Sequence, residues 1–432
     1  MRAACALGLR VKKLRRSRFR AMLIYRILIT LLAPLLAVAL AMRVLAKKET
    51  IDDLRERLGL WKRLPNGKVI WIHGASNGEL RAAQTLIQAL AARHTGTTIL
   101  ITCNTTTARR MVRNWGLSRV DARLAPLDLR WIYSRMAARI NLQQFILLEA
   151  DFWPNRILAF KRKGIATALV AGRLSRKSAD GWARFSAISE AMFRAFDLIC
   201  AQDDASEKSL LALGARPGAI GTQITLKSFY HADTVPLPHT QRREVWLAAS
   251  THEGEDEILL NAHLEARKTI PNLRMILAPR HPKRAPHIAR LAQGLGLKIA
   301  LRSEGAQLDD PCDVFLADTL GEMDLWYRAA GVCFVAGSLV AKGGHTPFEP
   351  AFHECALLHG AHLENFAQPY ADLAKCGGAQ LCTNKHEIAQ ALLALTHQDA
   401  ASVQRANAHT ALAQTHQDLD AALNALDQLS KP

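Results

Sequence analysis

Residues 69–80 read VIWIHGASNGEL, an apolar run followed by a glycine and then by a serine and a glutamate at helix-start spacing. The run Val69–His73 is typical of a buried strand, and from Leu80 onward apolar residues recur at helical spacing. A strand that turns into a helix in this way is the first unit of an α/β fold. Ser76 and Glu79 also fit a capping box, in which the glutamate reaches back to the start of its helix. The stretch alone leaves open whether Glu79 caps the helix or serves as a catalytic base.

The same strand–helix unit recurs along two parts of the chain. In the first part, strand-like runs are predicted at residues 69–75, 97–103, 144–150, 166–172, 196–202 and 220–226. In the second part they are predicted at residues 245–251, 273–280, 297–303, 313–319 and 332–338. Helical runs such as 107–115 and 204–213 lie between them. The alternation predicts two doubly wound parallel sheets, and ligands of such sheets bind beyond the carboxyl ends of the strands.

Five parts of the chain are predicted from these patterns and from the breaks between them. A polar, proline-containing stretch without hydrophobic periodicity separates the two α/β regions and reads as a linker. The predicted parts are a basic N-terminal segment at 1–48 with a membrane anchor at 22–42, a Rossmann-like domain at 49–228, the linker at 229–240, a second Rossmann-like domain at 241–400 and a helical tail at 401–432.

The formal charge of +18 is concentrated at the N-terminus. Residues 1–48 hold twelve Lys and Arg and no acidic residue, which leaves about +6 for the rest of the chain. A charge localised in this way indicates a role for the N-terminal segment and not for the folded domains. No nucleic-acid partner is therefore predicted.

The basic segment encloses Met22–Met42, MLIYRILITLLAPLLAVALAM, with Arg26 as its one charged residue. Its length allows a helix to cross a bilayer, and an arginine near the end can snorkel to the interface. A cleaved signal peptide is disfavoured, because no small-residue cleavage site precedes the basic residues that follow. Basic flanks also suit an anchor that lies on the membrane, so crossing and shallow attachment both stay open.

The cysteine, histidine and glycine patterns limit the kinds of site and cofactor that the chain is expected to have. The eight cysteines include no CxxC pair, and several lie within apolar runs, which predicts reduced thiols and a catalytic body in the cytoplasm. None of the sixteen histidines falls in an HExxH pattern, so neither a metal nor another cofactor is predicted. The chain has no GxGxxG after its first strand and no Walker sequence, which disfavours a dinucleotide or ATP enzyme of the usual kind.

The second α/β region has the features of an anion site. PRHPKR places Arg280 and three further basic residues directly after a predicted strand. GGHTPFEP offers two glycines for close backbone approach, then Thr346 as N-cap, Pro347 at the first helical position and Glu349 at the third. A helix start behind glycines suits a phosphate group, because free N–H groups and the helix dipole face it.

A series of further motifs follows in a fixed order. They are LRERLG at 54–59, HGASNGE at 73–79, APLDL at 125–129, EADFWPN at 149–155, GRLSRKSADGW at 172–182, APRHP at 278–282, LGEMDLWYRAA at 320–330, VAGSLVAKGGHTPFEPA at 335–351 and HLENF at 362–366. Together with the apolar segment, they resemble the 3-deoxy-D-manno-octulosonic acid (Kdo) transferases, membrane-associated glycosyltransferases of the two-domain GT-B type. The resemblance runs from about Met22 to about residue 400, which makes Met22 a candidate initiator.

The resemblance implies a fold, a reaction and a set of site residues. The fold is GT-B, with two Rossmann-like domains facing a central cleft and an N-terminal anchor helix. The reaction is transfer of Kdo, with inversion, from CMP-Kdo to the lipid A precursor at the cytoplasmic face of the inner membrane. By position, Glu79 matches the general base, and Glu149 and Lys227 match groups that support the transition state. The residues that match CMP-sugar contacts are Pro279, Arg280, Gly321, Glu322, Met323, Thr346, Pro347, Phe348 and Glu349.

Departures from the family pattern cluster in the first α/β region, which is expected to meet the acceptor. They are Asn77, Ala150–Phe152 and Ile224–Leu226, and a fourth, Thr346, lies in the second region. A glutamate at a helix N-terminus is expected to stay ionised at neutral pH, as a base requires. The alternatives are a transferase or epimerase that uses another nucleotide sugar, and a membrane-tethered, non-catalytic binding protein.

Overall fold

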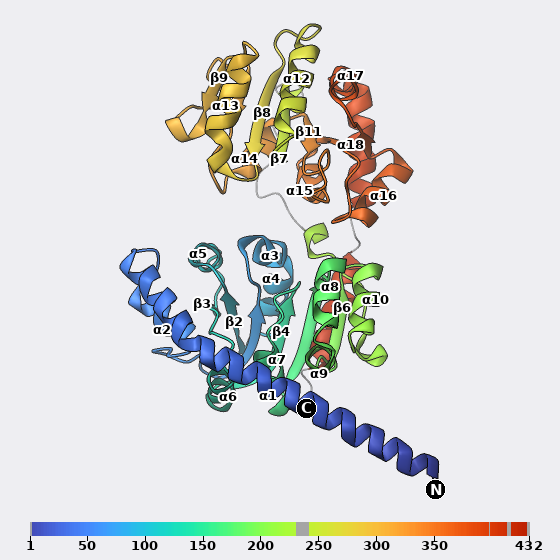
Figure 1. Ribbon diagram of the computed structural model, residues 1–432. Helices are drawn as coiled ribbons and strands as arrows, with labels where there is room; N and C mark the ends of the chain where they lie inside the picture. The colour runs from blue at the N-terminus through green and yellow to red at the C-terminus, as the bar shows by residue number, and fades with distance from the viewer. Residues whose placement is uncertain (1, 230–241, 397, 413–415, 430–432) are drawn as a thin grey trace. The chain divides into compact units, whose positions relative to one another are not determined.

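The computed structural model describes residues 2–229, 242–396, 398–412 and 416–429 (Figure 1). The chain divides into two compact units, one formed by Met1–Leu226 with Thr415–Pro432 and the other by Lys227–Gln414. Phe229 ends a short 3-10 helix, η2 (Leu226–Phe229), and the rest of the predicted linker, 230–240, lies outside the described residues. Each unit is described by itself.

The first unit is built on a six-stranded parallel sheet with the strand order β3-β2-β1-β4-β5-β6. This is the order of a doubly wound dinucleotide-type sheet, in which the direction of winding reverses between β1 and β4. The strands are β1 (Lys68–His73), β2 (Thr97–Cys103), β3 (Val120–Leu124), β4 (Asn141–Leu148), β5 (Ala166–Gly172) and β6 (Leu198–Ala201).

Helices cover both faces of this sheet, and their apolar sides form one core. Trp71 of β1 and Phe145 of β4 lie in a buried aromatic cluster with Tyr133 and Phe160, whose ring centroids are 5.0–6.3 Å apart. The helices are α2 (Ile51–Arg57), α3 (Asn77–Ala82), α4 (Gln84–Arg93), α5 (Thr106–Asn114), α6 (Arg130–Arg139), α7 (Pro154–Arg162), α8 (Arg176–Ala183), α9 (Ser186–Phe193), α10 (Asp204–Ala212) and the C-terminal α19 (His416–Leu429).

The second unit is built on a seven-stranded parallel sheet with the order β13-β12-β11-β7-β8-β10-β9. The winding reverses at β7, which lies between β8 and β11. The strands are β7 (Val245–Thr251), β8 (Arg274–Pro279), β9 (Ile299–Leu301), β10 (Val314–Leu316), β11 (Val332–Val335), β12 (Ala356–His359) and β13 (Ala379–Leu381).

Two buried apolar clusters, one on each face, join this second sheet to its helices. The helices are α12 (Asp256–Arg267), α13 (Ala285–Gly294), α14 (Met323–Ala329), α15 (Phe348–Phe352), α16 (Ala367–Cys376), α17 (Lys385–Leu395) and α18 (Gln398–Leu412). Short 3-10 turns η3 (Pro282–Arg284) and η4 (Arg302–Glu304) follow β8 and β9. The prediction of two parallel α/β sheets is therefore confirmed.

Most predicted strands are present, with one error and three omissions. Residues 220–226 do not form a strand: Ile220 makes an isolated bridge with Ile199, and the segment then enters η2. Strands β3, β12 and β13 were not predicted. Each is short, and β3 and β13 lie at sheet edges where polar residues interrupt the apolar pattern.

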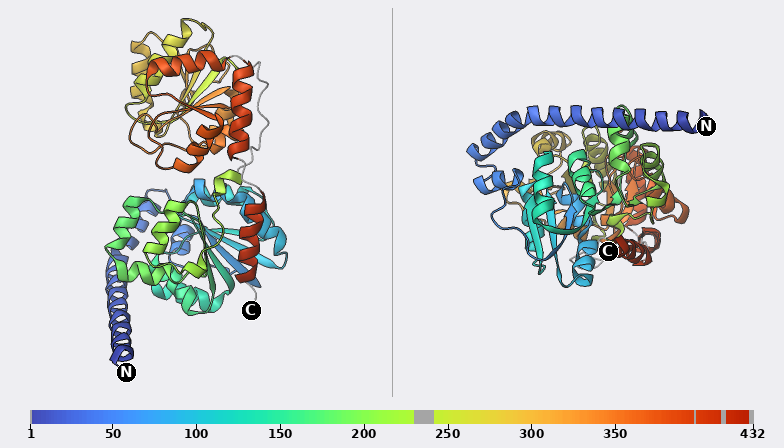
Figure 2. Two further views of the ribbon diagram at one scale, coloured as in Figure 1. Left: turned by 90° about the vertical axis from the view of Figure 1, so that its right-hand side faces the viewer. Right: turned by 90° about the horizontal axis from the view of Figure 1, so that it is seen from below.

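The N-terminal helix α1 (Arg2–Leu45) runs along the outside of the first unit and contacts α9 and α2 (Figures 1 and 2). Arg20–Leu45 is long and apolar enough to cross a membrane by length and composition. Its buried and half-buried positions recur every three to four residues and face the protein: Met22, Tyr25, Arg26, Ile29, Ala33, Ala37, Leu40 and Val44. Leucines on the opposite side are exposed, so the helix has one side packed on the unit and one apolar side free of it.

The helical tail is divided between the two units. Helix α18 packs against β12, α15 and α16 of the second unit, whereas α19 packs against α4 and β6 of the first. Ion pairs from Arg93 to Asp420 and Asp427 tie α19 to the end of α4.

The seven cysteines whose side chains the structure describes are unpaired. Six are buried within the fold and Cys376 is exposed. Burial raises the pKa of thiols such as Cys103 to about 11 and Cys200 to about 12, so they stay protonated and pack as small apolar groups.

Candidate active site

Glu79 lies in the first turn of α3, directly beyond the carboxyl end of β1. Ser76 is the N-cap of this helix, and its hydroxyl oxygen accepts a hydrogen bond from the Glu79 N–H at 3.3 Å. The Glu79 carboxylate accepts from the Ala75 N–H at 2.7 Å and from the Ser76 hydroxyl at 3.2 Å. The glutamate therefore reaches back one residue beyond the N-cap N–H that a capping box would bind.

The environment of Glu79 differs from the expectation of a permanently ionised carboxylate. Burial raises its pKa to about 7, and the neighbouring carboxylate of Glu149 acts in the same direction. The bonds from Ala75 and Ser76 favour the ionised form but do not outweigh these effects. With a pKa of about 7, Glu79 is only partly ionised at neutral pH, whereas an ionised carboxylate was predicted, because desolvation exceeds the benefit of the helix start. Its pKa instead lies where a general base can both release and accept a proton.

Glu149 follows β4, the strand next to β1 at the winding reversal. Its backbone has φ of 52°, a left-handed conformation that is costly for a residue with a side chain. The Glu149 N–H bonds to the Val170 carbonyl and its own carbonyl accepts from the Arg173 N–H, so both neighbouring peptides are tied to β5 and its following loop. The turn places Glu149 close enough to Glu79 for their charges to interact.

Behind these two glutamates lies a buried chain of hydrogen bonds that starts at the last residue of β1. His73 Nε2 lies 2.7 Å from Asp151 Oδ2, and His73 Nδ1 lies 2.9 Å from the Thr102 hydroxyl. The Trp71 indole N–H donates to the same hydroxyl, which leaves the hydroxyl hydrogen for His73 Nδ1. Burial lowers the pKa of His73 to about 4, so the ring is neutral and donates from Nε2 to Asp151.

Asp151 is held from several sides. His73 holds its pKa well below the usual range, with the buried Arg156 acting in the same direction. The amide of Asn104 and the indole N–H of Trp153 donate to its two carboxylate oxygens at 3.3 and 2.9 Å. Asp151 is therefore a fixed negative charge that orients the loop carrying Glu149.

The second unit gathers basic side chains beyond β7, β8 and β11. His252 follows β7, and its ring stacks on that of His345 at 5.1 Å, with the two Nε2 atoms 2.9 Å apart. Burial lowers the pKa of His345 to about 4, and the nearby charges of Arg280 and Lys227 contribute. The Lys227 ammonium lies 5.1 Å from the centre of the Phe366 ring. This set of cations and neutral imidazoles is suited to an anion.

The backbone beside these histidines is arranged by one buried carboxylate. Glu255 is fully buried and accepts hydrogen bonds from the N–H groups of His252, Gly337, Ser338 and Leu339 at 2.8–3.0 Å. Gly337 has φ of 72°, and a Cβ there would come within 3.0 Å of the His345 ring. Only glycine allows the loop after β11 to approach the histidine pair so closely.

The predicted CMP-sugar residues lie at the carboxyl edge of the same sheet. Pro279 ends β8, and the Arg280 N–H bonds to the Thr251 carbonyl. Gly321 has φ of 91°, Glu322 is the N-cap of α14 and Met323 is its first residue. Arg302 binds the Glu322 carboxylate at 2.8 Å and holds its pKa below the usual range. Glu322 is thus already paired with a cation.

The glycine-flanked helix start differs from the prediction by one residue. Helix α15 begins at Phe348 with Pro347 in the N-cap position, so the capping box with Thr346 as N-cap is wrong. The proline ring has no N–H and shifts the first bonded turn forward. The Thr346 hydroxyl still accepts from the Phe348 N–H at 3.4 Å, and Glu349 lies in the first turn.

The site residues are distributed over both units. Glu79 and Glu149 belong to the first, whereas Lys227 and the predicted CMP-sugar residues belong to the second. Within the described residues, no group of three or more His, Cys, Asp or Glu side chains could hold a metal ion. His73, Asp151, His252, Glu255 and His345 were not predicted as site residues. Their sequence signal is position alone, at or just beyond strand ends, and their partners are far away in the sequence.

Known proteins are similar to this chain in sequence or in fold. Residues 52–229 match the family described as 3-deoxy-D-manno-octulosonic-acid transferase (kdotransferase). A 3-deoxy-D-manno-octulosonic acid transferase of Haemophilus influenzae is 30% identical over 364 residues, which cover 82% of this chain and 85% of the relative. The enzyme of the same name from Bordetella pertussis is 33% identical over 345 residues, covering 75% and 78%.

A solved structure of a putative UDP-N-acetylglucosamine 2-epimerase from Listeria monocytogenes shares the two-unit fold. It has a TM-score of 0.58 at 13% identity and covers 84% of this chain and 97% of the epimerase. At that identity the likeness concerns the GT-B-like architecture alone. With the sequence identity to the transferases over most of their length, the chain belongs to the 3-deoxy-D-manno-octulosonic acid transferase family of glycosyltransferases.

Proposed function

We propose that this enzyme transfers Kdo from CMP-Kdo to a hydroxyl of the lipid A precursor, with inversion and with Glu79 as the general base. Membership of the family supports Kdo transfer in lipopolysaccharide biosynthesis. The observation that carries the finer proposal is Glu79 itself: a carboxylate at the winding reversal of the first sheet, held by the Ala75 N–H, with its pKa raised to about 7.

The proposed step is a single displacement. Glu79 accepts the proton of the acceptor hydroxyl as its oxygen forms a bond to the anomeric carbon of Kdo. The bond from that carbon to the phosphate oxygen of CMP breaks, and CMP leaves with the electron pair. Attack from the side opposite the leaving group inverts the anomeric centre. The raised pKa of Glu79 makes the carboxylate a stronger base than an exposed glutamate.

The second unit is proposed to bind the donor and to stabilise the charge that develops on the CMP phosphate. Lys227 and Arg280 supply cations near the His252–His345 pair, and the first turn of α15 supplies N–H groups. Cations and N–H groups fixed in advance stabilise a leaving phosphate more than the ground state. Glu149 is proposed to tune Glu79 by keeping its pKa high.

The apolar side of α1 is proposed to hold the enzyme at the cytoplasmic face of the inner membrane, where a lipid acceptor is embedded. Attachment confines enzyme and acceptor to one surface and so raises the effective acceptor concentration. Whether α1 crosses the bilayer or lies on it is not needed for this effect.

The test is Glu79→Gln, assayed with CMP-Kdo and lipid A precursor by the mass of the lipid product. Loss of a base typically lowers the rate by about 10² to 10⁴, and inhibition by CMP should stay unchanged. Ser76→Ala is the control for capping, because it removes the helix cap at a cost of about 1 kcal/mol while the Glu79 carboxylate keeps its bond from the Ala75 N–H. Normal turnover in Glu79→Gln, with a stability loss like that of the control, would assign the residue to capping alone.

A further inference from the structure

A cavity of about 300 Å³ lies in the first unit between the end of α1, the start of α2 and the first turns of α5. Two of its nine lining residues are acidic, Glu49 and Asp53, and five are basic: Lys47, Lys48, Arg109, Arg110 and Arg113. None of the proposed catalytic residues lines this cavity, so the proposed reaction does not account for it.

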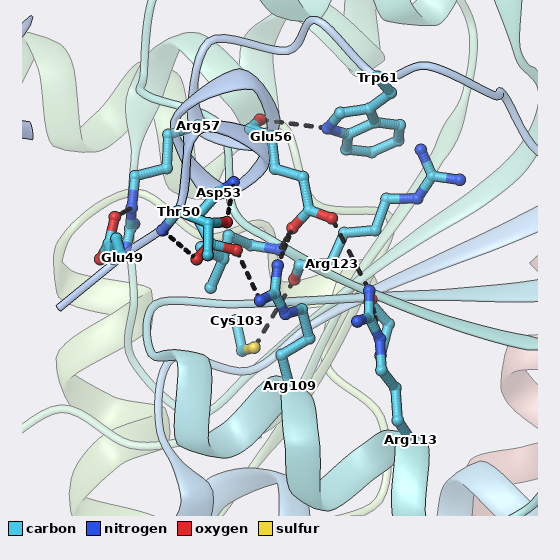
Figure 3. A network of polar contacts seen from close by, with 12 residues as sticks. Glu49, Thr50, Asp53, Glu56, Arg57, Trp61, Cys103, Arg109, Arg113 and Arg123 are labelled. Atoms are coloured by element: carbon cyan, nitrogen blue, oxygen red, sulfur yellow. Dashed lines mark hydrogen bonds and ion pairs between the residues drawn. The ribbon is translucent and has the colours of Figure 1, made fainter. Parts of the chain in front are cut away.

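The two carboxylates of this cavity are already neutralised. Glu49 has a side chain only 1% exposed, and it is bound by Arg43 at 2.9 Å and by Arg57 at 2.8 Å. Asp53 caps α2 through Thr50 and pairs with Arg109 at 2.6 Å. Figure 3 shows Arg109 between the carboxylates of Asp53 and Glu56, with Arg57 turned toward Glu49. These pairs form the floor of the cavity and leave it no free acid.

Three cations at the mouth have no such partner. The side chains of Lys47, Lys48 and Arg110 are exposed, and no carboxylate of the described residues forms an ion pair with them. Lys47 also has φ of 55°, a left-handed conformation at the turn from α1 to α2. Glycine or asparagine would adopt this turn at lower cost. A lysine here keeps a cation at the cavity in spite of the backbone strain.

The position of the cavity relates it to the membrane and to Glu79. Lys47 and Lys48 come two and three residues after Leu45, the end of the apolar helix, which is where headgroups begin if that helix contacts lipid. On the other side, the hydroxyls of Thr105, the N-cap of α5, and Thr107, in its first turn, donate to Asn77 Oδ1 at 3.2 and 3.0 Å. Asn77 is in α3, the helix that carries Glu79.

A second set of bonds links the cavity to the same edge of the sheet. Arg57 donates to the Asn104 carbonyl at 2.9 Å, and the Asn104 side chain donates to Asp151 at 3.3 Å. The cavity and the base are therefore neighbours, joined by α5 and by the loop after β2. A headgroup held in the cavity would keep the rest of its lipid close to Glu79.

We propose that this cavity binds a phosphate ester of a lipid headgroup, through Lys47, Lys48 and Arg110. Arginine and lysine side chains without acidic partners suit phosphate, which accepts several charge-assisted hydrogen bonds. The part of this inference that rests on the proposed function is that the bound lipid is presented toward Glu79. The phosphate belongs either to the glycolipid acceptor or to an anionic phospholipid beside it. Both lipids present a phosphate group at the level of the membrane headgroups.

The test compares two triple variants of the full-length protein. Lys47→Gln with Lys48→Gln and Arg110→Gln removes the three unpaired cations. Lys68→Gln with Arg139→Gln and Lys163→Gln is the control, because it removes the same charge from exposed positions at the opposite, amino edge of the same sheet. All six side chains are exposed, so melting temperatures should stay near that of the unmodified protein.

The first arm measures KM and kcat in neutral detergent with a phosphorylated glycolipid acceptor and with the same acceptor after phosphatase treatment. If the acceptor supplies the phosphate, KM for the phosphorylated acceptor should rise by about tenfold or more in the first variant. The change in kcat should be small, and the difference from the control should disappear with the dephosphorylated acceptor.

The second arm measures binding to phosphatidylcholine vesicles with and without phosphatidylglycerol, and needs no turnover. If a phospholipid supplies the phosphate, the first variant should lose about tenfold in affinity for the anionic vesicles only. The expected loss of affinity in either arm supports the phosphate site and identifies which lipid supplies the phosphate. Equal behaviour of both triple variants in both arms would overturn it. Absence of Kdo transfer in every variant would refute the proposed function and leave the vesicle arm as the test of the cavity.

Discussion

At the scale of single residues, Glu79 combines a helix-start contact with the catalytic role proposed for it. It closes the first turn of α3 through Ala75 and Ser76, which fixes its position to within hydrogen-bond distance. Burial and Glu149 raise its pKa to about 7, which a simple capping residue does not require. A capping glutamate is usually stabilised in its ionised form, so the two roles oppose each other electrostatically. A raised pKa at this position is what the proposed role of proton acceptor would require.

The first prediction concerns the pH dependence of transfer. Because the base must be ionised, kcat/KM should fall about tenfold per pH unit below 7 and level off above it. Glu149→Gln removes a neighbouring negative charge, so the break should move to lower pH, whatever the residual rate. The measurement is kcat/KM from pH 5.5 to 8.5 in both proteins. A flat profile, or an unmoved break, would contradict this account of Glu79.

The same raised pKa predicts that Glu79 stabilises the folded chain at low pH, where the proposed base is inactive. The pKa of Glu79 is higher in the folded chain than its ordinary value of 4.5, so folding favours the protonated form. Its contribution to stability is therefore present below about pH 4.5 and is lost as pH rises through about 7. Glu79→Gln should lack this dependence, so its melting temperature relative to the unmodified protein should increase between pH 5 and pH 8.

A third prediction concerns the donor side. Arg280→Lys keeps the charge but removes the planar guanidinium, so inhibition by CMP should weaken by about tenfold if the contact is bidentate. Arg290→Lys, at an exposed position of α13 in the same unit, is the control and should change nothing. Inhibition constants for CMP measure both. Unchanged inhibition in Arg280→Lys and in Arg280→Ala would remove Arg280 from the donor site.

The residues that could be predicted from the sequence are those inside contiguous motifs. Glu79, Arg280 and Glu349 were predicted as site residues because a strand, a turn and a helix start follow one another over a few residues. His73, Asp151 and Glu255 were missed because their partners come from distant strands: Asp151 lies 78 residues from His73, and Glu255 accepts from a loop more than 80 residues away. The pKa of Glu79 was missed for the same reason, since it depends on burial by other segments.

At the scale of elements, helix α1 is an integral part of the first unit as well as an apolar segment. The Tyr25 hydroxyl donates to Asp128 Oδ2 at 2.9 Å. The Asp128 carboxylate also accepts from the N–H groups of Asn155 and Arg156 at the start of α7, at 3.0 and 2.8 Å. Helix α7 begins directly after the loop that holds Glu149 and Asp151. The apolar helix is thus linked to the loop of Glu149 and Asp151 through one buried carboxylate.

This link gives the fourth prediction. Tyr25→Phe removes the hydroxyl that bonds to Asp128, so unfolding free energy should fall by about 1.5–3 kcal/mol. Amide exchange of Asn155 and Arg156 should accelerate, because their acceptor is less restrained. Thr30→Val is the control, since the Thr30 hydroxyl bonds only to the Arg26 carbonyl within its own helix. Equal stability of the two variants in detergent would show that Tyr25 does not hold the helix in place.

The central strands of each sheet could be predicted better than the strands at the sheet edges. Central strands such as β2, β5 and β7 match the predicted runs residue for residue, because both faces of a central parallel strand are buried and its sequence is largely apolar. Edge strands β3 and β13 carry polar residues and gave no such pattern. Residues 220–226 looked apolar enough for a strand, but Ile224 and Leu226 pack into the unit from an irregular segment.

At the scale of the whole molecule, the chain passes from the first unit to the second and then returns. Helix α19 completes the first unit: Leu419, Leu423 and Leu426 are buried, and the Leu426 carbonyl accepts from the Gln144 amide of β4. The tail was predicted as helical from its composition, but its place could not be predicted, because nothing local distinguishes α19 from α18.

Because α19 packs on the first unit, substitutions in α19 should destabilise the first unit and not the second. Leu423→Ala with Leu426→Ala should destabilise the first unit by several kcal/mol, at about 2–5 kcal/mol for each buried leucine. Leu392→Ala in α17 is the matched control for the second unit, where it is fully buried. Hydrogen exchange resolved by segment should show increased opening of β4 and β6 in the first case and of β7 and β11 in the second. The reverse pattern would refute the division of the tail.

The outward side of α1 is the surface through which the whole molecule is proposed to attach to a membrane. Leu28, Leu31 and Leu35 are 54%, 69% and 67% exposed and pack on no other part of the described chain. Replacing all three by Gln should therefore leave melting temperature nearly unchanged while removing roughly 1.5–3 kcal/mol of apolar burial per residue in lipid. The protein should move from the membrane to the soluble fraction.

The control is Ile29→Gln with Ala33→Gln on the side that packs against the core of the first unit. It should lower the melting temperature and leave membrane attachment largely intact. Transfer to an acceptor in vesicles should fall in the outward variant, and transfer to a detergent-dispersed acceptor should persist, because attachment acts on the effective concentration. If the outward variant stays bound to vesicles at high salt, another apolar surface carries the attachment. If it loses activity on the dispersed acceptor while folded, α1 takes part in binding the acceptor directly.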